Sequence, residues 1–280
     1  MIYLIDSYSL LNTIAPNADG LPDLKAIIQR WHGERIRRID RYIQLCVAGG
    51  LSCVAGRSLP ENTGVYLASR NGAVATSARA MSSIEADGQL PKPLHFVNTL
   101  GNSAGFYLTQ LLGLTGTAVV CSAEQLSFEA ALTHACLDLQ ARQCDTALVG
   151  SFDETPLPVQ HQRRRLNITD SQAPLLEGSH WLLLSRHAQN ARAKLRAPEY
   201  TESLSQALRR EDTGVQLAFS PNKAEASKLP GSHTVYNPVE GAIPHGSFSG
   251  AALVEQLKLP CGTHVAREGK TYCTVRWTSA

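Results

Sequence analysis

Long apolar runs and strong charge are both missing from this sequence of 280 residues. No stretch approaches the roughly 18 consecutive apolar residues of a membrane span, and MIYLIDSYSLLN at the start lacks the basic and small-residue regions of a signal peptide. The formal net charge is only +2, and the one basic run, 163–165, is typical of a solvated loop. These absences favour a cytoplasmic protein with no membrane span and no nucleic-acid partner.

Paired cysteine motifs are missing as well. Seven cysteines stand at irregular spacing without a CxxC pair, so neither a zinc site nor a disulfide framework is indicated. We therefore expect reduced thiols, no metal and no cofactor. Charged residues make up 18% of the chain, below the usual quarter or so, which suggests that some surface is buried against a partner.

Apolar periodicity predicts an α/β protein. In the first 150 residues, strands are expected at 1–6, 64–69, 117–123 and 147–152, and helices at 23–31, 37–53, 72–86, 103–112 and 126–142. This alternation is typical of a parallel sheet covered on both faces. Later segments predict strands at 180–185, 214–220 and 271–277, helices at 186–194 and 246–258, and loops at 155–174 and 221–231.

The stretch TAVVCSAEQLSFEAALTHA, residues 117–135, predicts a buried strand, a tight polar corner and a helix. Corners of this kind often carry a nucleophile. Cys121 lies four residues before Gln125, which occupies the corner itself. The pattern alone leaves open which of the two holds the working position.

The spacing around this corner is specific. Gly116 precedes Gln125 by nine residues, Ser127 follows two residues later, and Asp145 and then 149–151 (Val-Gly-Ser) complete the block. This block resembles the β-ketoacyl synthase branch of the thiolase-like fold. That family has a turn glycine, a nucleophilic cysteine nine residues later in T-A-C-x-S-G, a G-x-x-D turn and an A-G-G strand. The register puts Gln125 on the nucleophile and Ser127 on the motif serine.

Weaker matches extend the resemblance over most of residues 35–195. FVNTLGNSAGFYLTQLLGLTG is similar to the family's spaced asparagine and glycines, 37–41 to its R-x-D-R helix, and Glu177–Gly178 to its E-G-A-G strand entrance. The resemblance implies a thiolase-like layered αβαβα fold built from two related halves. We expect these halves at residues 1–155 and 156–280, the second one shortened.

A glutamine at the nucleophile position implies that condensation is lost. A ketosynthase cysteine attacks as a thiolate and holds the acyl chain as a thioester, whereas a carboxamide neither ionises nor forms such an ester. In this register Cys121 lies within the strand and faces the core, a usual place for free cysteine. A slipped alignment with Cys121 as nucleophile would misplace Asp145.

The family's two catalytic histidines are also missing from their motifs. G-H-x-x-G-A-A is matched by GSFSGAA, residues 246–252, with Ser247 where the histidine stands. His245 lies two positions early and is kept as a candidate for a displaced catalytic residue. H-G-T is absent, and 220–222 (Ser-Pro-Asn) lies where it would be expected. Three losses together predict that this chain is not an enzyme.

Among glutamine-bearing relatives, the pattern is most similar to a chain length factor. This resemblance implies pairing with an active β-ketoacyl synthase, as a heterodimer or a dimer of heterodimers, with acyl carrier protein reached through the complex. It also suggests an aryl polyene, polyketide or fatty-acyl product. Two alternatives stay open: a decarboxylase of malonyl carrier protein, although that relative keeps both histidines, and a divergent condensing acyltransferase that uses Cys121 or His245.

The resemblance also implies where the partner and the acyl tunnel lie. The strand 117–123 would meet its mate across a two-fold axis, which makes Thr117, Val119 and Cys121 interface candidates. In helix 72–86, Ala73, Thr76 and Ala80 share one face and are candidates for the tunnel lining. Close helix–sheet packing explains these small residues equally well.

Overall fold

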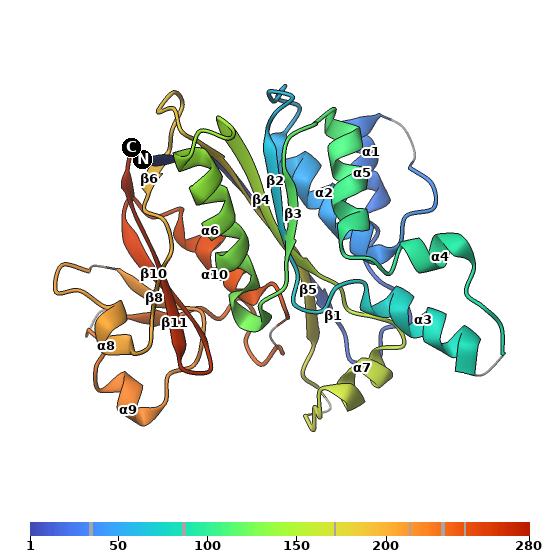
Figure 1. The fold of residues 1–280 in the computed structure, drawn as a ribbon. Helices are drawn as coiled ribbons and strands as arrows, with labels where there is room; N and C mark the ends of the chain where they lie inside the picture. The colour runs from blue at the N-terminus through green and yellow to red at the C-terminus, as the bar shows by residue number, and fades with distance from the viewer. Residues whose placement is uncertain (34–35, 86–87, 171, 213, 231–232, 244) are drawn as a thin grey trace.

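The computed structural model describes residues 1–33, 36–85, 88–170, 172–212, 214–230, 233–243 and 245–280 (Figure 1). The helices are α1 (Lys25–His32), α2 (Arg41–Val54), α3 (Val74–Glu85), α4 (Pro93–Val97), α5 (Asn102–Leu112), the 3-10 turn η1 (Glu124–Leu126), α6 (Ser127–Gln140), α7 (Val159–Arg165), α8 (Leu204–Ala207), α9 (Lys223–Ala226) and α10 (Phe248–Gln256). The strands are β1 (Ile2–Ile14), β2 (Gly64–Ala68), β3 (Ala118–Cys121), β4 (Thr146–Asp153), β5 (Leu175–Ser185), β6 (Ala193–Leu195), β7 (Glu199–Thr201), β8 (Val215–Leu217), β9 (Thr234–Val235), β10 (Gly262–Glu268) and β11 (Thr271–Ser279).

The strands of the described ranges form one mixed sheet. Its order is β3-β2-β4-β5-β1-β6-β11-β10-β8-β9, with β7 paired to β11. The parallel sheet expected for the first 150 residues is confirmed only for β2, β3 and β4. Strand β1 is antiparallel to both β5 and β6, so it joins the two parts of the sheet.

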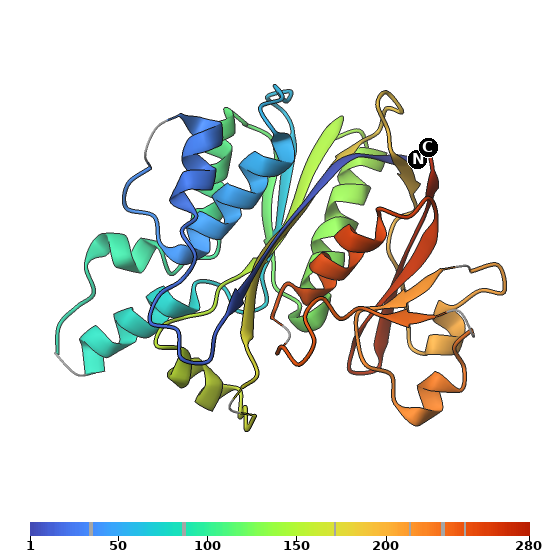
Figure 2. The same ribbon diagram turned by 180° about the vertical axis from the view of Figure 1, so that it is seen from behind.

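Helices and strands are stacked in layers. Helix α2 contacts β4 and β5 and α5 contacts β2 and β3 on one face, with α1 outside α2, while α6 and α10 contact the opposite face of the same part of the sheet. The sheet turns, so that α6 and α10 lie between its first strands and β10 and β11, and α8 and α9 flank the far side (Figures 1 and 2). The layered α/β thiolase-like fold expected from the resemblance is confirmed. The boundary at residues 155 and 156 stays a prediction.

Trp181 organises the packing between α2 and the sheet. It is fully buried in β5 and stacks on Phe152 of β4 with ring centroids 6.1 Å apart. A Cβ added at Gly49 would lie 2.3 Å from the Trp181 ring nitrogen, and one at Gly150 would lie 2.5 Å from its six-membered ring. Glycine at these positions therefore provides the space that the indole needs.

Some predicted segments differ from the structure; the loop expected at 221–231, for example, contains the short helix α9. Residues 155–174, expected as a loop, contain α7, because Arg163 turns inward and donates hydrogen bonds to the carbonyls of Asp170 and Ala173. Residues 186–194, expected as a helix, form a turn instead, since Asn190 has φ +60° and β6 begins at Ala193 to pair with β1. Pairing of backbone groups with the sheet outweighs helix propensity here.

Strand β3 was expected to be buried, and this is wrong for the chain alone. Among the strands of the described ranges it pairs only with β2, so its other edge is free. Val119 and Cys121 face α6, whereas Ala118 and Val120 are exposed. Strand β3 therefore has the apolar composition of a buried strand but forms an uncovered edge of the sheet.

Candidate functional site

Residue Ser127 holds the corner between β3 and α6. Its hydroxyl donates to the carbonyl of Glu124 over 2.7 Å and accepts from the backbone N–H of Ala123 over 2.9 Å. Glu124 has φ +49°, a left-handed conformation that non-glycine residues adopt rarely. Ser127, the motif serine of the sequence register, thus stabilises a strained turn. The half-buried Gln125 follows Glu124 in this turn.

Two carboxylates lie beside Gln125. Its backbone N–H donates to Oε2 of Glu268, at the end of β10, over 3.2 Å. Glu124 forms an ion pair with Arg70, with Nε and Oε2 3.0 Å apart. The corner therefore combines a neutral amide side chain with negative charge, the opposite of what a thiolate nucleophile requires.

A cavity of about 500 Å³ opens next to Gln125. It is lined by Gln125, Leu176, Ala218, Phe219, Ser220, Val235, Tyr236, Asn237, Pro238, Val239, Gly241, Ala242, Phe248 and Arg267. The structure thus brings the corner together with Ser220, the expected place of the H-G-T motif, and with Phe248, the residue after Ser247. The described lining residues include the hydroxyls of Ser220 and Tyr236 and the guanidinium of Arg267, but no thiol, imidazole or carboxylate.

Cys121 lies outside this cavity. It packs in a buried cluster with Tyr66, Phe128 and Ala131. Burial raises the pKa of the thiol above its usual value, which keeps the sulfur protonated. Its position at the inner face of β3 is suited to packing.

Ser247 and His245 bond to each other in the interior. Ser247 Oγ lies 2.6 Å from Nδ1 of His245, and the His245 ring is 5.4 Å from that of His180 on β5. Burial lowers the pKa of His245 to about 3, and burial followed by the charge of His245 lowers the pKa of His180. Both rings are neutral at physiological pH. His245 borders a separate cavity of about 130 Å³, not the one beside Gln125.

The sequence reasoning missed three buried titratable residues in this interior region: His180, Asp153 and Glu154. Asp153 accepts hydrogen bonds from Ser69 Oγ at 2.8 Å and from the N–H of Asn71 at 2.9 Å. Burial raises the pKa of Asp153 to about 6 and that of Glu154 to about 7. For Asp153 and Glu154, the sequence signal was the pair of acidic residues that ends the otherwise apolar run ALVGSFDE. None of the three lines the cavity beside Gln125.

The three tunnel candidates on α3 are buried against this chain. Thr76 is fully buried and donates to Oδ2 of Asp40 over 2.9 Å, and Ala73 belongs to the core cluster around α2. Ala80 is 8% exposed. None of these residues borders the cavity at Gln125.

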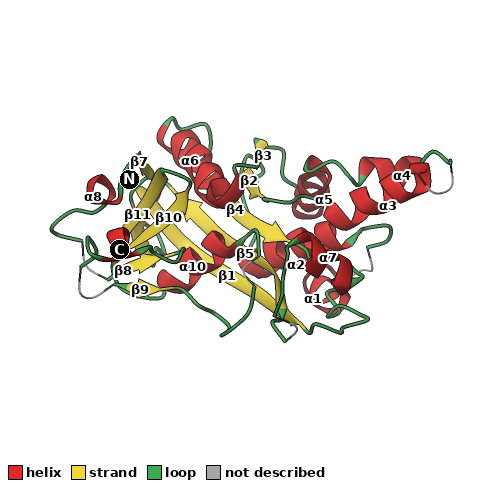
Figure 3. Cartoon of the chain, turned by 90° about the horizontal axis from the view of Figure 1, so that it is seen from below, coloured by secondary structure: helices red, strands yellow, loops and turns green. Residues whose placement is uncertain are grey.

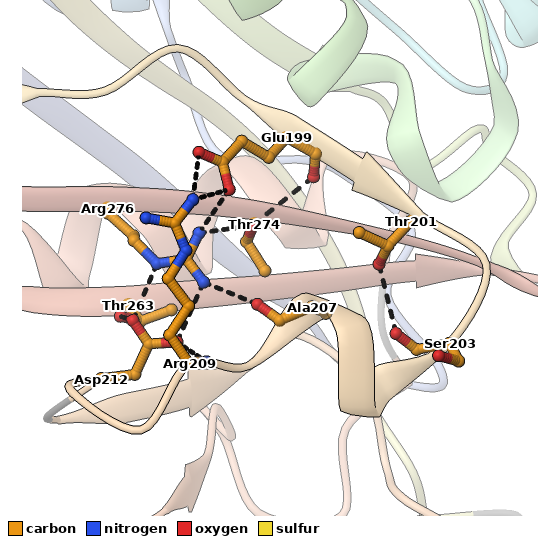
Figure 4. Close-up of polar contacts among 9 residues, drawn as sticks. All are labelled: Glu199, Thr201, Ser203, Ala207, Arg209, Asp212, Thr263, Thr274 and Arg276. Carbon is orange, nitrogen blue, oxygen red and sulfur yellow. Dashed lines mark hydrogen bonds and ion pairs between the residues drawn. The ribbon is translucent and has the colours of Figure 1, made fainter.

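A charged cluster in the second half is a further candidate (Figure 4). Arg276 on β11 uses all five of its N–H groups: it donates to both carboxylate oxygens of Asp212, to Glu199, to Thr274 Oγ1 and to the carbonyl of Ala207. Arg209 donates to both oxygens of Glu199 at 2.7 Å. Because the donors of Arg276 are used internally, we interpret the cluster as structural.

Exposed apolar side chains gather near the free edge of β3. The apolar face comprises Phe96 and Val97 of α4, Leu100, Phe106 of α5 and Val120 of β3, which are 37–61% exposed. Helix α5 contacts β3, and a Cβ on Gly101 would lie 3.5 Å from Val120 Cγ1, so α5 begins beside Val120. Beside it, α3 and α4 extend from the body of the molecule (Figure 3). Patches of this kind mark interaction surfaces.

Two kinds of site are absent from the described part of the chain. No helix in it has the length and apolarity to cross a bilayer. Nor do its His, Cys, Asp and Glu side chains form a group of three or more arranged to hold a metal ion.

Comparison with known proteins gives consistent relatives. Residues 21–170 match the model of the β-ketoacyl synthase N-terminal domain. Similar solved structures include the ishigamide ketosynthase/chain length factor (15% identity, TM-score 0.72, 99% of both chains) and the ketosynthase ApeO in complex with its chain length factor ApeC from Xenorhabdus doucetiae (16%, TM-score 0.55, 99% of both). Another is a type II polyketide synthase acyl carrier protein in complex with its ketosynthase (12%, TM-score 0.68, 100% and 99%). Curated protein sequences give no match.

Proposed function

Because this chain belongs to the β-ketoacyl synthase family, we propose that it is a non-catalytic member, a chain length factor that pairs with an active β-ketoacyl synthase. The observation that carries the proposal is the cavity at the corner. By the sequence register it lies where the family's reaction site is expected, and its described walls offer Gln125 and no thiol, imidazole or carboxylate. The residue types that could react, Cys121 and His245, lie elsewhere in the interior.

The apolar face supports pairing. An uncovered edge strand flanked by exposed aromatic and aliphatic side chains is a liability for a chain that stays alone. We place the partner synthase on β3, α4 and α5, with Thr117, Val119 and Cys121 on or beneath that contact. Acyl carrier protein would then reach the complex through the active subunit, and the product we favour is a long polyene or polyketide chain.

Helix α3 is proposed to close the acyl tunnel together with the partner. Its small inward residues are packed in the isolated chain, so the tunnel would form only where α3 meets the synthase. In the reconstituted pair, Ala80→Phe should shorten the products by filling space at the far end, while Ser82→Phe on the exposed side of α3 is the matched control. Unchanged product lengths in Ala80→Phe would remove α3 from the tunnel.

The main test is reconstitution with an active β-ketoacyl synthase from the same organism. We expect the two chains to co-purify, and the synthase to extend carrier-bound chains only when this chain is present. Intact-mass measurement should show an acyl adduct on the synthase and none on this chain. An adduct on Cys121 would establish the acyltransferase alternative, and CO₂ release from malonyl carrier protein by this chain alone would establish the decarboxylase.

A further inference from the structure

Glu268 reaches the corner from a distant part of the sequence. It ends β10, opposite Thr271 of β11, and the two strands are joined by Gly269 and Lys270. Gly269 has φ +56°, which favours glycine in this tight turn. The half-buried Glu268 is thereby held so that Oε2 lies 3.2 Å from the backbone nitrogen of Gln125.

The N–H that Glu268 occupies is the one best placed to stabilise negative charge at position 125. Gln125 lies within the 3-10 turn η1 that leads into α6. Acyl transfer at this position would develop an oxyanion on the acyl carbonyl, and backbone N–H groups of the turn are its available donors. Here that donor already has a fixed carboxylate as its acceptor. A second carboxylate, Glu124, lies next to it and is held by Arg70.

We infer that Glu268 acts as an internal plug of the anion site at the corner. It takes the hydrogen bond that a substrate oxyanion would need, and its charge opposes both a thiolate and an oxyanion at position 125. The inference rests on the proposed non-catalytic function and deepens it. With this N–H occupied by Glu268, we expect that the chain does not withdraw acyl groups from the cysteine of its partner.

The reactivity of a cysteine placed at the corner tests the plug. In a Cys261→Ser background, which removes the exposed thiol, we would compare Gln125→Cys with Gln125→Cys combined with Glu268→Gln. The rate of alkylation by iodoacetamide is followed from pH 6 to pH 10 by peptide mass. We expect the Glu268→Gln change to raise the rate at pH 7 at least tenfold by lowering the thiol pKa. Glu255→Gln, a distant exposed carboxylate paired with Lys258, should leave the rate unchanged.

Equal rates with and without the Glu268→Gln change would overturn the inference. If the cysteine variants do not fold, amide hydrogen exchange answers the same question: Glu268→Ala should speed exchange at the Gln125 N–H at least tenfold in the full-length chain, and unchanged exchange refutes the plug. Both measurements use this chain without its partner. Failure of pairing or detection of enzyme activity would refute the proposed function and leave these rates as they are.

Discussion

The two ends of the sheet are stabilised in opposite ways. At the first end, β3 is four residues long and is covered by apolar helices whose outer side chains remain exposed. At the second end, β8 and β9 are only three and two residues long. There, a small apolar cluster is joined by ion pairs and hydrogen bonds: Arg276 contacts Asp212 and Glu199, and Glu225 accepts from Arg267 and Tyr272.

This difference indicates which end needs another protein. Charged groups that satisfy one another leave little to offer a partner, whereas exposed apolar side chains gain free energy only when something covers them. On the proposed function, we therefore expect the first end to be the interaction surface and the second half to rely on its own contacts. The predictions below would break or sharpen that contrast.

The largest effect is expected at the apolar face. Phe106→Glu places a charge where the partner should bury a phenyl ring, and we expect at least a 100-fold weaker complex with the synthase, since burying an unpaired charge is costly. Leu259→Glu, at a similarly exposed apolar position in the second half, is the control. Affinity is measured by surface plasmon resonance or analytical ultracentrifugation. An equal loss in both variants, or none in either, would end the assignment of the first end as the interface.

The second prediction concerns the other end of the sheet, where Arg276 pairs with Asp212 and Glu199. Arg276→Met leaves Asp212, whose side chain is 4% exposed, without its main partner, and breaking a buried pair in this way should lower the free energy of unfolding by about 3 kcal/mol. Urea titration followed by circular dichroism measures the change. Lys258→Met removes an exposed pair on α10 and should change stability by less than about 1 kcal/mol. Equal free energies of unfolding for the two variants would show that the Arg276 cluster does not stabilise the second half.

The smallest effect lies between the two ends, at His245. Its folded pKa is about 3 and its unfolded pKa is about 6.5, so only the unfolded state gains a proton as the pH falls below about 6.5. His245 therefore costs stability in acid. Between pH 7 and pH 5, the contribution of His245 to the free energy of unfolding should fall by about 2 kcal/mol.

His245→Asn isolates this contribution, because its amide can still reach Ser247 and carries no titrating group. The stability difference between wild type and variant, measured by urea unfolding at both pH values, should shift by that amount. Asp153 and Glu154 have raised pKa values and gain stability as the pH falls, but they are present in both proteins. A pH-independent difference would show that His245 titrates in the folded chain as it does in the unfolded chain.

The sequence predicted the helices and strands whose periodicity is strong, such as α2, β2 and α6, and it placed Gln125 at the corner. It also predicted that Cys121 lies within the strand and faces the core, as observed, but it could not show that His245 borders a different cavity, because that depends on which face of each element is covered. Glu268 was missed altogether. It lies 143 residues from its partner Gln125, and local pattern carries no information about a contact formed when a hairpin from the second half folds onto the first.

The free edge of β3 also bears on how much of this protein a cell can make. Backbone groups that no neighbouring strand satisfies, next to exposed phenylalanine and valine, are a template for self-association. If the proposed pairing holds, copies without a synthase to bind are expected to be more prone to self-association. Production of the two chains in matched amounts would then follow from a single strand four residues long.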